Sequence, residues 1–323
     1  MSPDGTERDW YSRSGVRTGP RRLLRDELRS GQLYFPPALM PYAGHPLVRG
    51  LPDERRQALF ARHLFQYLDF TAQFETQVVN RATERIAGGR SGVAVDEGTR
   101  LDAYRIYCDE GYHALYSLDV VQQVSRACGV APIPYEFGSF RDRLDAVGEE
   151  ALPGEPALAQ LLQVVVFETL VTAILADVPK DRRVLTVVRD IVRDHARDEG
   201  WHHAFFSEFF RRLWTQFPAS LRTRVARCLP ELIRSSLLPD LRPVRAALVA
   251  AGLTRGGAEE VVRDCYPRDG VEAGIRAAAR HSVRLFTETG VLQVPGGHEA
   301  FDAAALLPAS TDQAGDGGEE YGV

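Results

Sequence analysis

The sequence predicts an all-α protein in which a four-helix bundle is extended by additional C-terminal helices. Apolar residues recur three and four positions apart over long segments, which is the spacing that gives a helix one buried face. Proline, glycine and acidic residues mark the ends of these segments. No segment has the alternation of a half-buried strand, and we find no G-x-G-x-x-G, P-loop or nucleophile-elbow motif.

The first two long helices are expected to form an antiparallel pair. The first is predicted to begin at residues 51–54, where a proline precedes two acidic residues, and to end at residues 88–89, both glycine. The second is predicted to begin at Asp96 or Thr99 and to end before Gly129. The apolar stripe of the first helix comprises Phe60, Leu64, Tyr67, Leu68, Thr71, Phe74, Glu75, Val78 and Val79.

The third and fourth core helices are predicted at about residues 155–177 and 181–217, with a break at Pro179. The segment between the two pairs is predicted as a crossover with one helical turn at residues 140–147. We expect residues 51–307 to form one domain. Within this domain we expect a core bundle at 51–217 and further helices at 219–237, 241–252, 257–264 and 270–289. Outside it we expect an irregular arm at 1–50 and a disordered, polar tail at 308–323.

Composition excludes several kinds of partner. The net charge of -5 and the pI near 6.0 give no basis for binding nucleic acid or an anionic membrane. The N-terminus has no apolar signal segment, and no apolar run is long enough to span a bilayer. Four cysteines without a C-x-x-C pair suit a reducing compartment. We therefore expect a cytoplasmic protein.

Two nearly identical pentapeptides carry the chemistry. Residues 109–113 read DEGYH and residues 198–202 read DEGWH, and FET precedes each copy, at 74–76 and 167–169. In E-x-x-H the carboxylate and the imidazole lie three residues apart, so both project from one helix face and reach one metal ion. The glutamate of each FET is a single carboxylate within an apolar stripe, which is costly unless it is paired or metal-bound.

The spacing of the repeat brings its halves to one level of the bundle. Glu110 follows Glu75 by 35 residues, Glu199 follows Glu168 by 31 residues, and each interval contains one turn of the chain. At about 1.5 Å per residue, the chain runs out and returns to the same height in each pair. Four helices thus present E, E-x-x-H, E and E-x-x-H together, which is the arrangement of di-iron and di-manganese carboxylate proteins in ferritin-like bundles.

The two halves differ at one position. His195 lies four residues before Glu199 on the same face, where the first half has Ile106. His203 is an alternative to His202, but the E-x-x-H register favours His202. The predicted ligand set is Glu75, Glu110, His113, Glu168, His195, Glu199 and His202.

Other residues near the motifs have predicted supporting roles. Asp109 and Asp198 are expected to accept the second ring N–H of a ligating histidine on a facing helix. Gly111 and Gly200 are expected to allow close approach of helices at the metal level. The residues that either line a substrate pocket or belong to the ordinary core are Tyr67, Thr71, Phe74, Val171, Thr172 and Ile174.

These residues resemble the AurF-like di-iron N-oxygenases, which convert arylamines to nitro compounds in natural-product pathways. The resemblance rests on the seven predicted ligands, and above all on His195, because that family has a third histidine on its fourth core helix. Tyr67 is similar to a pocket tyrosine of the family. Where the family places an arginine for the carboxylate of an aminobenzoate, this sequence has Phe70, and Arg280 and Arg284 on the last helix are candidate replacements.

The resemblance implies an O2-dependent N-oxygenase with two iron ions that oxidises a small-molecule amine to a hydroxylamine, nitroso or nitro product in antibiotic biosynthesis. A reductase or ferredoxin would supply electrons, because no flavin or nicotinamide motif is visible. Two alternatives stay open: a di-iron C–H hydroxylase or desaturase, and a ferritin-like iron-binding protein without catalysis. We also expect a homodimer, because apolar helices outside the bundle would otherwise be exposed.

Overall fold

The computed structural model describes residues 10–25, 28, 31–170 and 173–307 of the chain, without the side chains of residues 173 and 174. The regular secondary structure of the described residues is helical, and their sole strand-like pairing is an isolated bridge between Leu33 and Val184. The predicted all-α class is therefore confirmed. No helix in these ranges is long and apolar enough to cross a membrane. The predicted tail at residues 308–323 lies outside the described residues.

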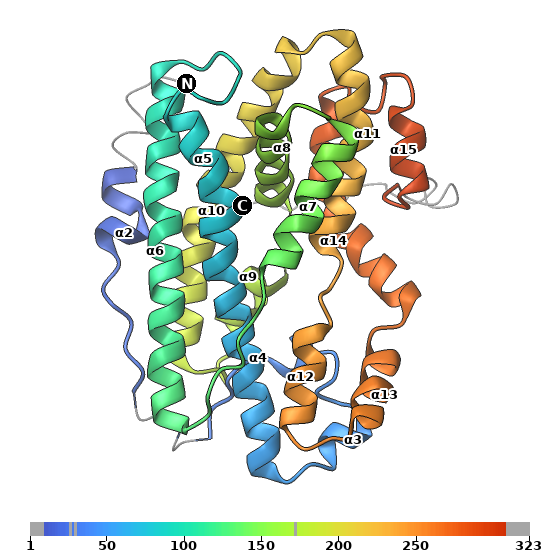
Figure 1. Ribbon diagram of the computed structural model, residues 1–323. Coiled ribbons are helices and arrows are strands. Elements are labelled where there is room, and N and C mark those ends of the chain that lie inside the picture. Colours follow the sequence, from blue (N-terminus) through green and yellow to red (C-terminus); the bar gives the residue numbers. More distant parts are fainter. Residues whose placement is uncertain (1–9, 26–27, 29–30, 171–172, 308–323) are drawn as a thin grey trace, which may run out of the picture.

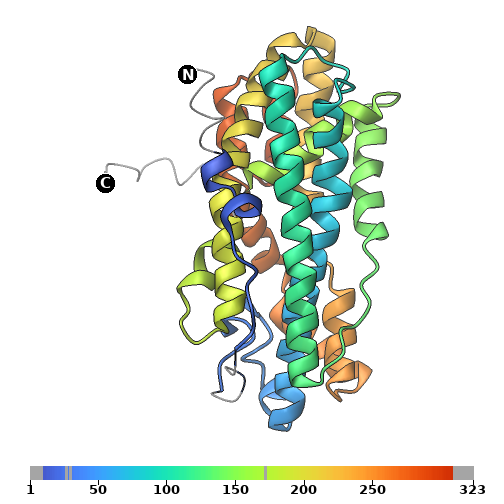
Figure 2. The same ribbon diagram turned by 90° about the vertical axis from the view of Figure 1, so that its left-hand side faces the viewer.

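Four long helical segments form the core bundle. They are α4 (Asp53–Phe74) continued by α5 (Asn80–Ala87), α6 (Glu97–Cys128), α8 (Pro156–Thr169) and α10 (Thr186–Gln216). Figures 1 and 2 show α4, α5 and α6 side by side, with α10 next to α6. The ends of α6 follow the sequence signals: the Asp96 side chain accepts a hydrogen bond from Thr99 N, and Gly129 adopts a φ of 71° beyond the last turn.

Two of the core helices are interrupted at the FET segments. A π-helical turn, η3 (Glu75–Val79), separates α4 from α5, and α8 ends at Thr169 before a short helix, α9 (Ala173–Asp177), and η4 (Val178–Lys180). The sequence predicted continuous helices at both places. A π turn adds one residue to a helical turn and so changes the direction in which the following side chains point. Both interruptions occur at a predicted ligand, Glu75 and Glu168.

The crossover contains a longer helix than predicted, α7 (Gly138–Ala151). It buries Phe140 and Leu144 against the core. Gly148 faces α8 so closely that a Cβ there would lie 2.5 Å from the Cβ of Ala159. Gly148 therefore suits close helix packing, whereas in the sequence the glycines of this segment favoured a loop.

The remaining helices surround the bundle. The C-terminal helices are α11 (Ala219–Leu237), α12 (Arg242–Ala250), α13 (Arg255–Cys265), α14 (Arg268–Glu288) and α15 (Gly297–Ala303), of which α15 was not predicted. Figure 1 shows α11 and α14 beside α7 and α8, α15 on the outer side of α11, and α12 and α13 near the start of α4. The predicted irregular arm contains α2 (Gly15–Thr18), η2 (Pro37–Leu39) and α3 (Pro46–Arg49).

The buried apolar side chains form two clusters, and a polar level separates them. On α6, the last member of the first cluster is Ile106, and the first member of the second cluster is Val120. On α10, the second cluster extends to Val192 and the first begins at Phe206. The motif residues lie between these positions, so the core is interrupted where the repeated pentapeptides face one another.

Candidate metal centre

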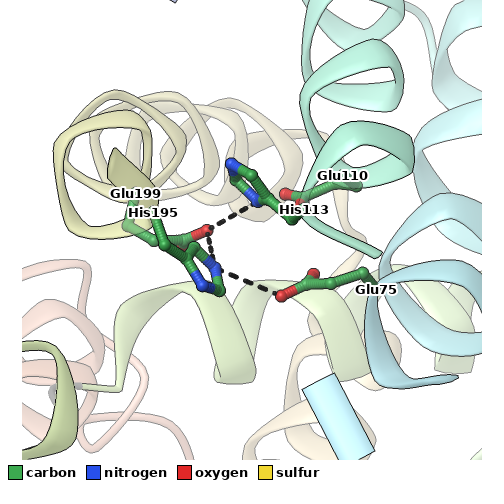
Figure 3. A group of neighbouring side chains, drawn as sticks. All are labelled: Glu75, Glu110, His113, His195 and Glu199. Atoms are coloured by element: carbon green, nitrogen blue, oxygen red, sulfur yellow. Dashed lines mark hydrogen bonds and ion pairs between the residues drawn. The ribbon is translucent and has the colours of Figure 1, made fainter. Parts of the chain in front are cut away.

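The seven predicted ligands converge in two overlapping groups, the first of which is drawn in Figure 3. In each group one potential ligand atom per residue lies within 4.8 Å of all the others. Both groups contain Glu110 and Glu199, which would therefore bridge two ions. The first group is Glu75, Glu110, His113, His195 and Glu199, and the second is Glu110, Glu168, Glu199 and His202.

In the first group, three helical segments contribute side chains to one point. His195 Nε2 lies 3.0 Å from Glu199 Oε1 and 3.3 Å from Glu75 Oε1. His113 Nδ1 lies 2.8 Å from Glu110 Oε2 and 3.7 Å from Glu199 Oε1. The histidine that distinguishes the two halves of the repeat thus faces Glu199, a carboxylate that His113 also faces.

Buried carboxylate oxygens of the centre lack partners in this chain. Glu75 Oε2 and Glu168 Oε2 are both buried without a hydrogen-bond partner. Between them in sequence, Glu110 Oε1 forms an ion pair with His202 Nδ1 at 2.8 Å. Buried polar atoms in proteins are almost always satisfied. Two unsatisfied carboxylate oxygens in one centre fit bound cations.

Charges inside the centre shift the pKa values of its members. Burial and the charge of Glu110 raise the pKa of Glu75 to about 8, and burial raises that of Glu168 well above its usual range. Burial alone would lower the pKa of His113, but Glu110, Asp198 and Glu199 outweigh it and raise that pKa to about 10. Protons therefore stabilise the ion-free centre at the positions that cations would take.

Asp109 and Asp198 contact the two motif histidines crosswise. His113 Nε2 lies 3.2 Å from Asp198 Oδ2, and His202 Nε2 lies 3.3 Å from Asp109 Oδ2. Each aspartate thus contacts a histidine on the facing helix, as the sequence predicts. A proton on Nε2 leaves the Nδ1 lone pair directed at the centre, which is the form that binds a metal.

Three residues of the N-terminal segment hold these aspartates, and no sequence pattern indicated them. Trp10 Nε1 donates to Asp109 Oδ2 at 2.8 Å, and the Ser14 hydroxyl donates to Asp109 Oδ1. The Gly15 N–H lies 3.1 Å from Asp198 Oδ2. A Cβ at Gly15 would lie 2.6 Å from that same oxygen, so only glycine fits there.

One tyrosine beside the centre was also missed. The Tyr116 hydroxyl is buried without a hydrogen-bond partner, and its ring centroid lies 5.5 Å from that of His113 and 6.4 Å from that of His195. Tyr116 follows His113 by three residues, so helical spacing alone could have placed it on the ligand face.

Two of the supporting predictions are wrong. Nothing lies within 4 Å of the Cβ position of Gly111 or Gly200, and both glycines are exposed, so neither allows helices of this chain to approach. Arg280 and Arg284 are exposed: the first donates to Ala277 O, and the second pairs with Glu288. They point away from the bundle because the buried face of α14 is formed by other residues, including Ala279 and Phe286.

The remaining predicted residues have mixed positions. Tyr67 lies close enough to Glu75 and Glu199 for their charges, together with burial, to raise its pKa. Thr71 is buried, and Phe74 packs in the core with its ring 4.1 Å from that of Phe167. Val171 and Thr172 lie outside the described residues, as does the Ile174 side chain. His203 does not join the ligand groups, because its Nδ1 lies 3.0 Å from the Glu168 carbonyl oxygen at the end of α8.

Comparison with known proteins identifies the family. Residues 24–290 match the family described as p-aminobenzoate N-oxygenase AurF. The chain is also 25% identical over 233 residues to the 4-aminobenzoate N-oxygenase of Streptomyces thioluteus, which covers 71% of this chain and 68% of that protein. The family match covers most of the chain and includes all seven candidate ligands, in agreement with the resemblance found in the sequence. The chain therefore belongs to the AurF p-aminobenzoate N-oxygenase family.

Proposed function

We propose that the protein is an O2-dependent di-iron N-oxygenase that oxidises an arylamine. The observation that carries the proposal is the pair of overlapping ligand groups that share Glu110 and Glu199. Carboxylate and imidazole ligands suit iron, and two shared carboxylates suit a pair of ions. The family and the Streptomyces relative supply the reaction class.

Iron held by Glu75, Glu110, His113, Glu168, His195, Glu199 and His202 would supply the O2 chemistry that places one oxygen atom on the amine nitrogen. The first step consumes O2, two electrons and two protons, and it yields the hydroxylamine and water. Further oxidation would give the nitroso or nitro product. The electrons come from an external donor, a reductase or a ferredoxin. Asp109 and Asp198 keep His202 and His113 in the ligating tautomer throughout.

The two groups differ in the number of residues that they supply. Five residues belong to the group that includes His195, and four belong to the group that includes His202. Fewer protein ligands leave more coordination positions for small molecules. We therefore propose that the amine is oxidised on the side of Glu168 and His202.

The aromatic surroundings of Phe70 support an apolar arylamine. Its ring lies 5.2 to 6.2 Å from the rings of Phe74, Tyr135, Phe137 and Phe140. The family's arginine for a substrate carboxylate has no counterpart there, and Arg280 and Arg284 do not replace it. The proposed substrate is an arylamine that packs on apolar side chains, without a carboxylate–arginine pair.

The test is single-turnover oxidation by the iron-loaded, reduced protein. A panel of arylamines with and without a ring carboxylate is mixed with O2, and the products are identified by mass spectrometry. We expect oxygen on nitrogen, with faster conversion of the amines that lack the carboxylate. Glu110→Ala should remove both activity and iron. Oxygen on carbon or loss of two hydrogens would instead identify a hydroxylase or a desaturase, and iron uptake without any product would identify an iron-binding protein.

A further inference from the structure

The N-terminal segment of residues 10–25 lies over the metal-binding level of α6 and α10. Its helix α2 packs on both of these core helices. In Figure 2 the segment, in dark blue, runs along the molecule between α6 and α10 on the side toward the viewer. It holds Asp109 and Asp198 through hydrogen bonds, and these aspartates contact the motif histidines. The segment is therefore one residue removed from the ligands of both groups.

A cavity of about 300 Å³ lies between this segment and α10. The indole rings of Trp10 and Trp201 line it, together with the two aspartates. Arg13 and Arg197 also line it, and both are exposed, so the cavity opens to solvent. It leads from the surface to the carboxylates that lie behind His113 and His202.

A short chain of contacts connects Trp10 with a ligand. Asp109 Oδ2 accepts a hydrogen bond from Trp10 Nε1 at 2.8 Å and lies 3.3 Å from His202 Nε2. Electron tunnelling weakens steeply with the width of each non-bonded gap, and both gaps here have the length of a hydrogen bond. Trp10 and Asp109 therefore provide a short route for electrons from the surface to the centre.

Positive charge surrounds the outer end of this route. Residues 10–25 contain five arginines and no acidic residue, whereas the whole chain has 39 Lys and Arg against 44 Asp and Glu. On α10, the exposed charged residues between positions 186 and 200 are Arg193 and Arg197. A local positive surface on an acidic protein attracts an acidic partner to that place, while the rest of the molecule repels it.

We propose that an acidic, ferredoxin-type electron donor docks on this surface and that its electrons pass through Trp10 and Asp109 to the metal centre. The inference rests on the proposed function, which requires two electrons from an external donor. In each encounter the iron–sulfur cluster of the donor is oxidised by one electron and one ferric ion is reduced to the ferrous state. Two encounters supply the electrons for the first oxidation of the amine. The docking surface comprises Trp10, Arg13, Arg17, Arg193 and Arg197.

Electrons and substrate would reach the centre from different sides. The apolar surroundings proposed for the arylamine belong to α4 and to the crossover, where the rings of Phe70 and Phe140 lie 5.2 Å apart. Figures 1 and 2 show α7 of the crossover and α2 of the N-terminal segment on opposite sides of α6. A donor bound over α2 and α10 would therefore leave the arylamine side open during reduction.

Binding of the donor is tested on the iron-free protein, so the result does not depend on activity. The probe is a plant-type [2Fe–2S] ferredoxin, an acidic protein, in a calorimetric titration. Wild type should bind it at low ionic strength, and added salt should weaken the complex. Arg193→Glu should bind roughly tenfold more weakly. Arg255→Glu, which reverses an exposed arginine on α13, is the matched control and should bind as wild type does.

Absence of binding by wild type, or equal binding by Arg193→Glu and wild type, would overturn the docking surface. Wild type reduced by dithionite is tested separately for single-turnover oxidation of the arylamines. Product in that reaction, without an effect of Arg193→Glu on ferredoxin binding, would refute this inference alone. Absence of any product would instead refute the proposed function.

Stopped-flow reduction of the ferric protein by an excess of reduced ferredoxin tests the route. Trp10→Phe lacks the indole N–H and should lower the rate at saturating ferredoxin roughly 10- to 100-fold, without a change in ferredoxin affinity. Arg193→Glu should show the reverse pattern, with a weaker affinity and an unchanged saturating rate. The midpoint potential of the centre is measured in both variants. An unchanged rate in Trp10→Phe, or a slower rate that a lower midpoint potential accounts for, would overturn the route through Trp10.

Discussion

Binding of iron to the ion-free protein should release protons. Burial and neighbouring carboxylates raise the pKa of Glu75 to about 8, so this carboxyl group holds a proton at pH 7. The same causes raise the pKa of Glu168 well above its usual value, which favours a proton there too. The pKa of His113 is near 10, because Glu110, Asp198 and Glu199 outweigh the effect of burial. The pKa of His195 is near 9, because Glu199 and Glu75 outweigh burial and the charge on His113.

The number of protons follows from the remaining groups. The same competition raises the pKa of His202 well above 6.5, whereas His202 and His113 help to lower the pKa of Glu110 to about 2 despite its burial. Each ligand must give up the proton on the atom that binds metal. Two carboxyl groups and three imidazolium rings can therefore release up to five protons when two ferrous ions bind at pH 7.

Anaerobic titration with ferrous iron in weakly buffered solution, followed by a pH-indicator dye, measures this number. Glu168→Gln has no proton to lose at that position and should release about one fewer. Glu149→Gln, an exposed position on α7, is the control and should match wild type. Uptake of two ions with release of about one proton or none would refute the reasoning, because the ions would then bind elsewhere.

Three further outcomes are expected. The melting temperature of the ion-free protein should fall from pH 7 to pH 10. The folded-state pKa values of Glu75 and His113 lie above the unfolded values of 4.5 and 6.5, so the stability that their bound protons contribute is lost as the pH rises. The melting temperature of the iron-loaded protein should change less. His195→Ala should retain about one iron of two and lose activity, and unchanged iron content would show that His195 is no ligand. Ser14→Ala should release iron to a chelator roughly 10- to 100-fold faster than wild type, because Asp109 loses a hydrogen-bond donor. Gly44→Ala is the control and should release iron at the wild-type rate. Equal release rates for Ser14→Ala and wild type would contradict a role for the N-terminal segment.

The parts of the centre that depend on helical spacing could be predicted from the sequence. Two pairs of ligands are local, because each pair lies on one helix: Glu110 with His113, and Glu199 with His202. The lengths of the helices then determine the level along the bundle at which each pair lies. The crosswise contacts of Asp109 followed from the same geometry. Spacing determines these features because the helices run uninterrupted between their caps.

Other features depend on contacts that no local pattern encodes. The hydrogen bond from Gly15 to Asp198 joins residues 183 positions apart, and the glycine needed there resembles any loop glycine in the sequence. The π turn at Glu75 depends on packing that the periodicity does not reveal. The predicted role of Gly111 in close helix packing is wrong, because the sequence shows a small residue in a helix without showing which side of the helix is covered.

The central claim is that one buried centre holds two iron ions between shared carboxylates. Crystals of the iron-loaded protein, measured on both sides of the iron absorption edge, test it most directly. Two anomalous peaks are predicted, both within coordination distance of Glu110 and Glu199, one also near His113 and His195 and the other near His202. A single peak, or two peaks that do not share Glu110 and Glu199, would contradict the account.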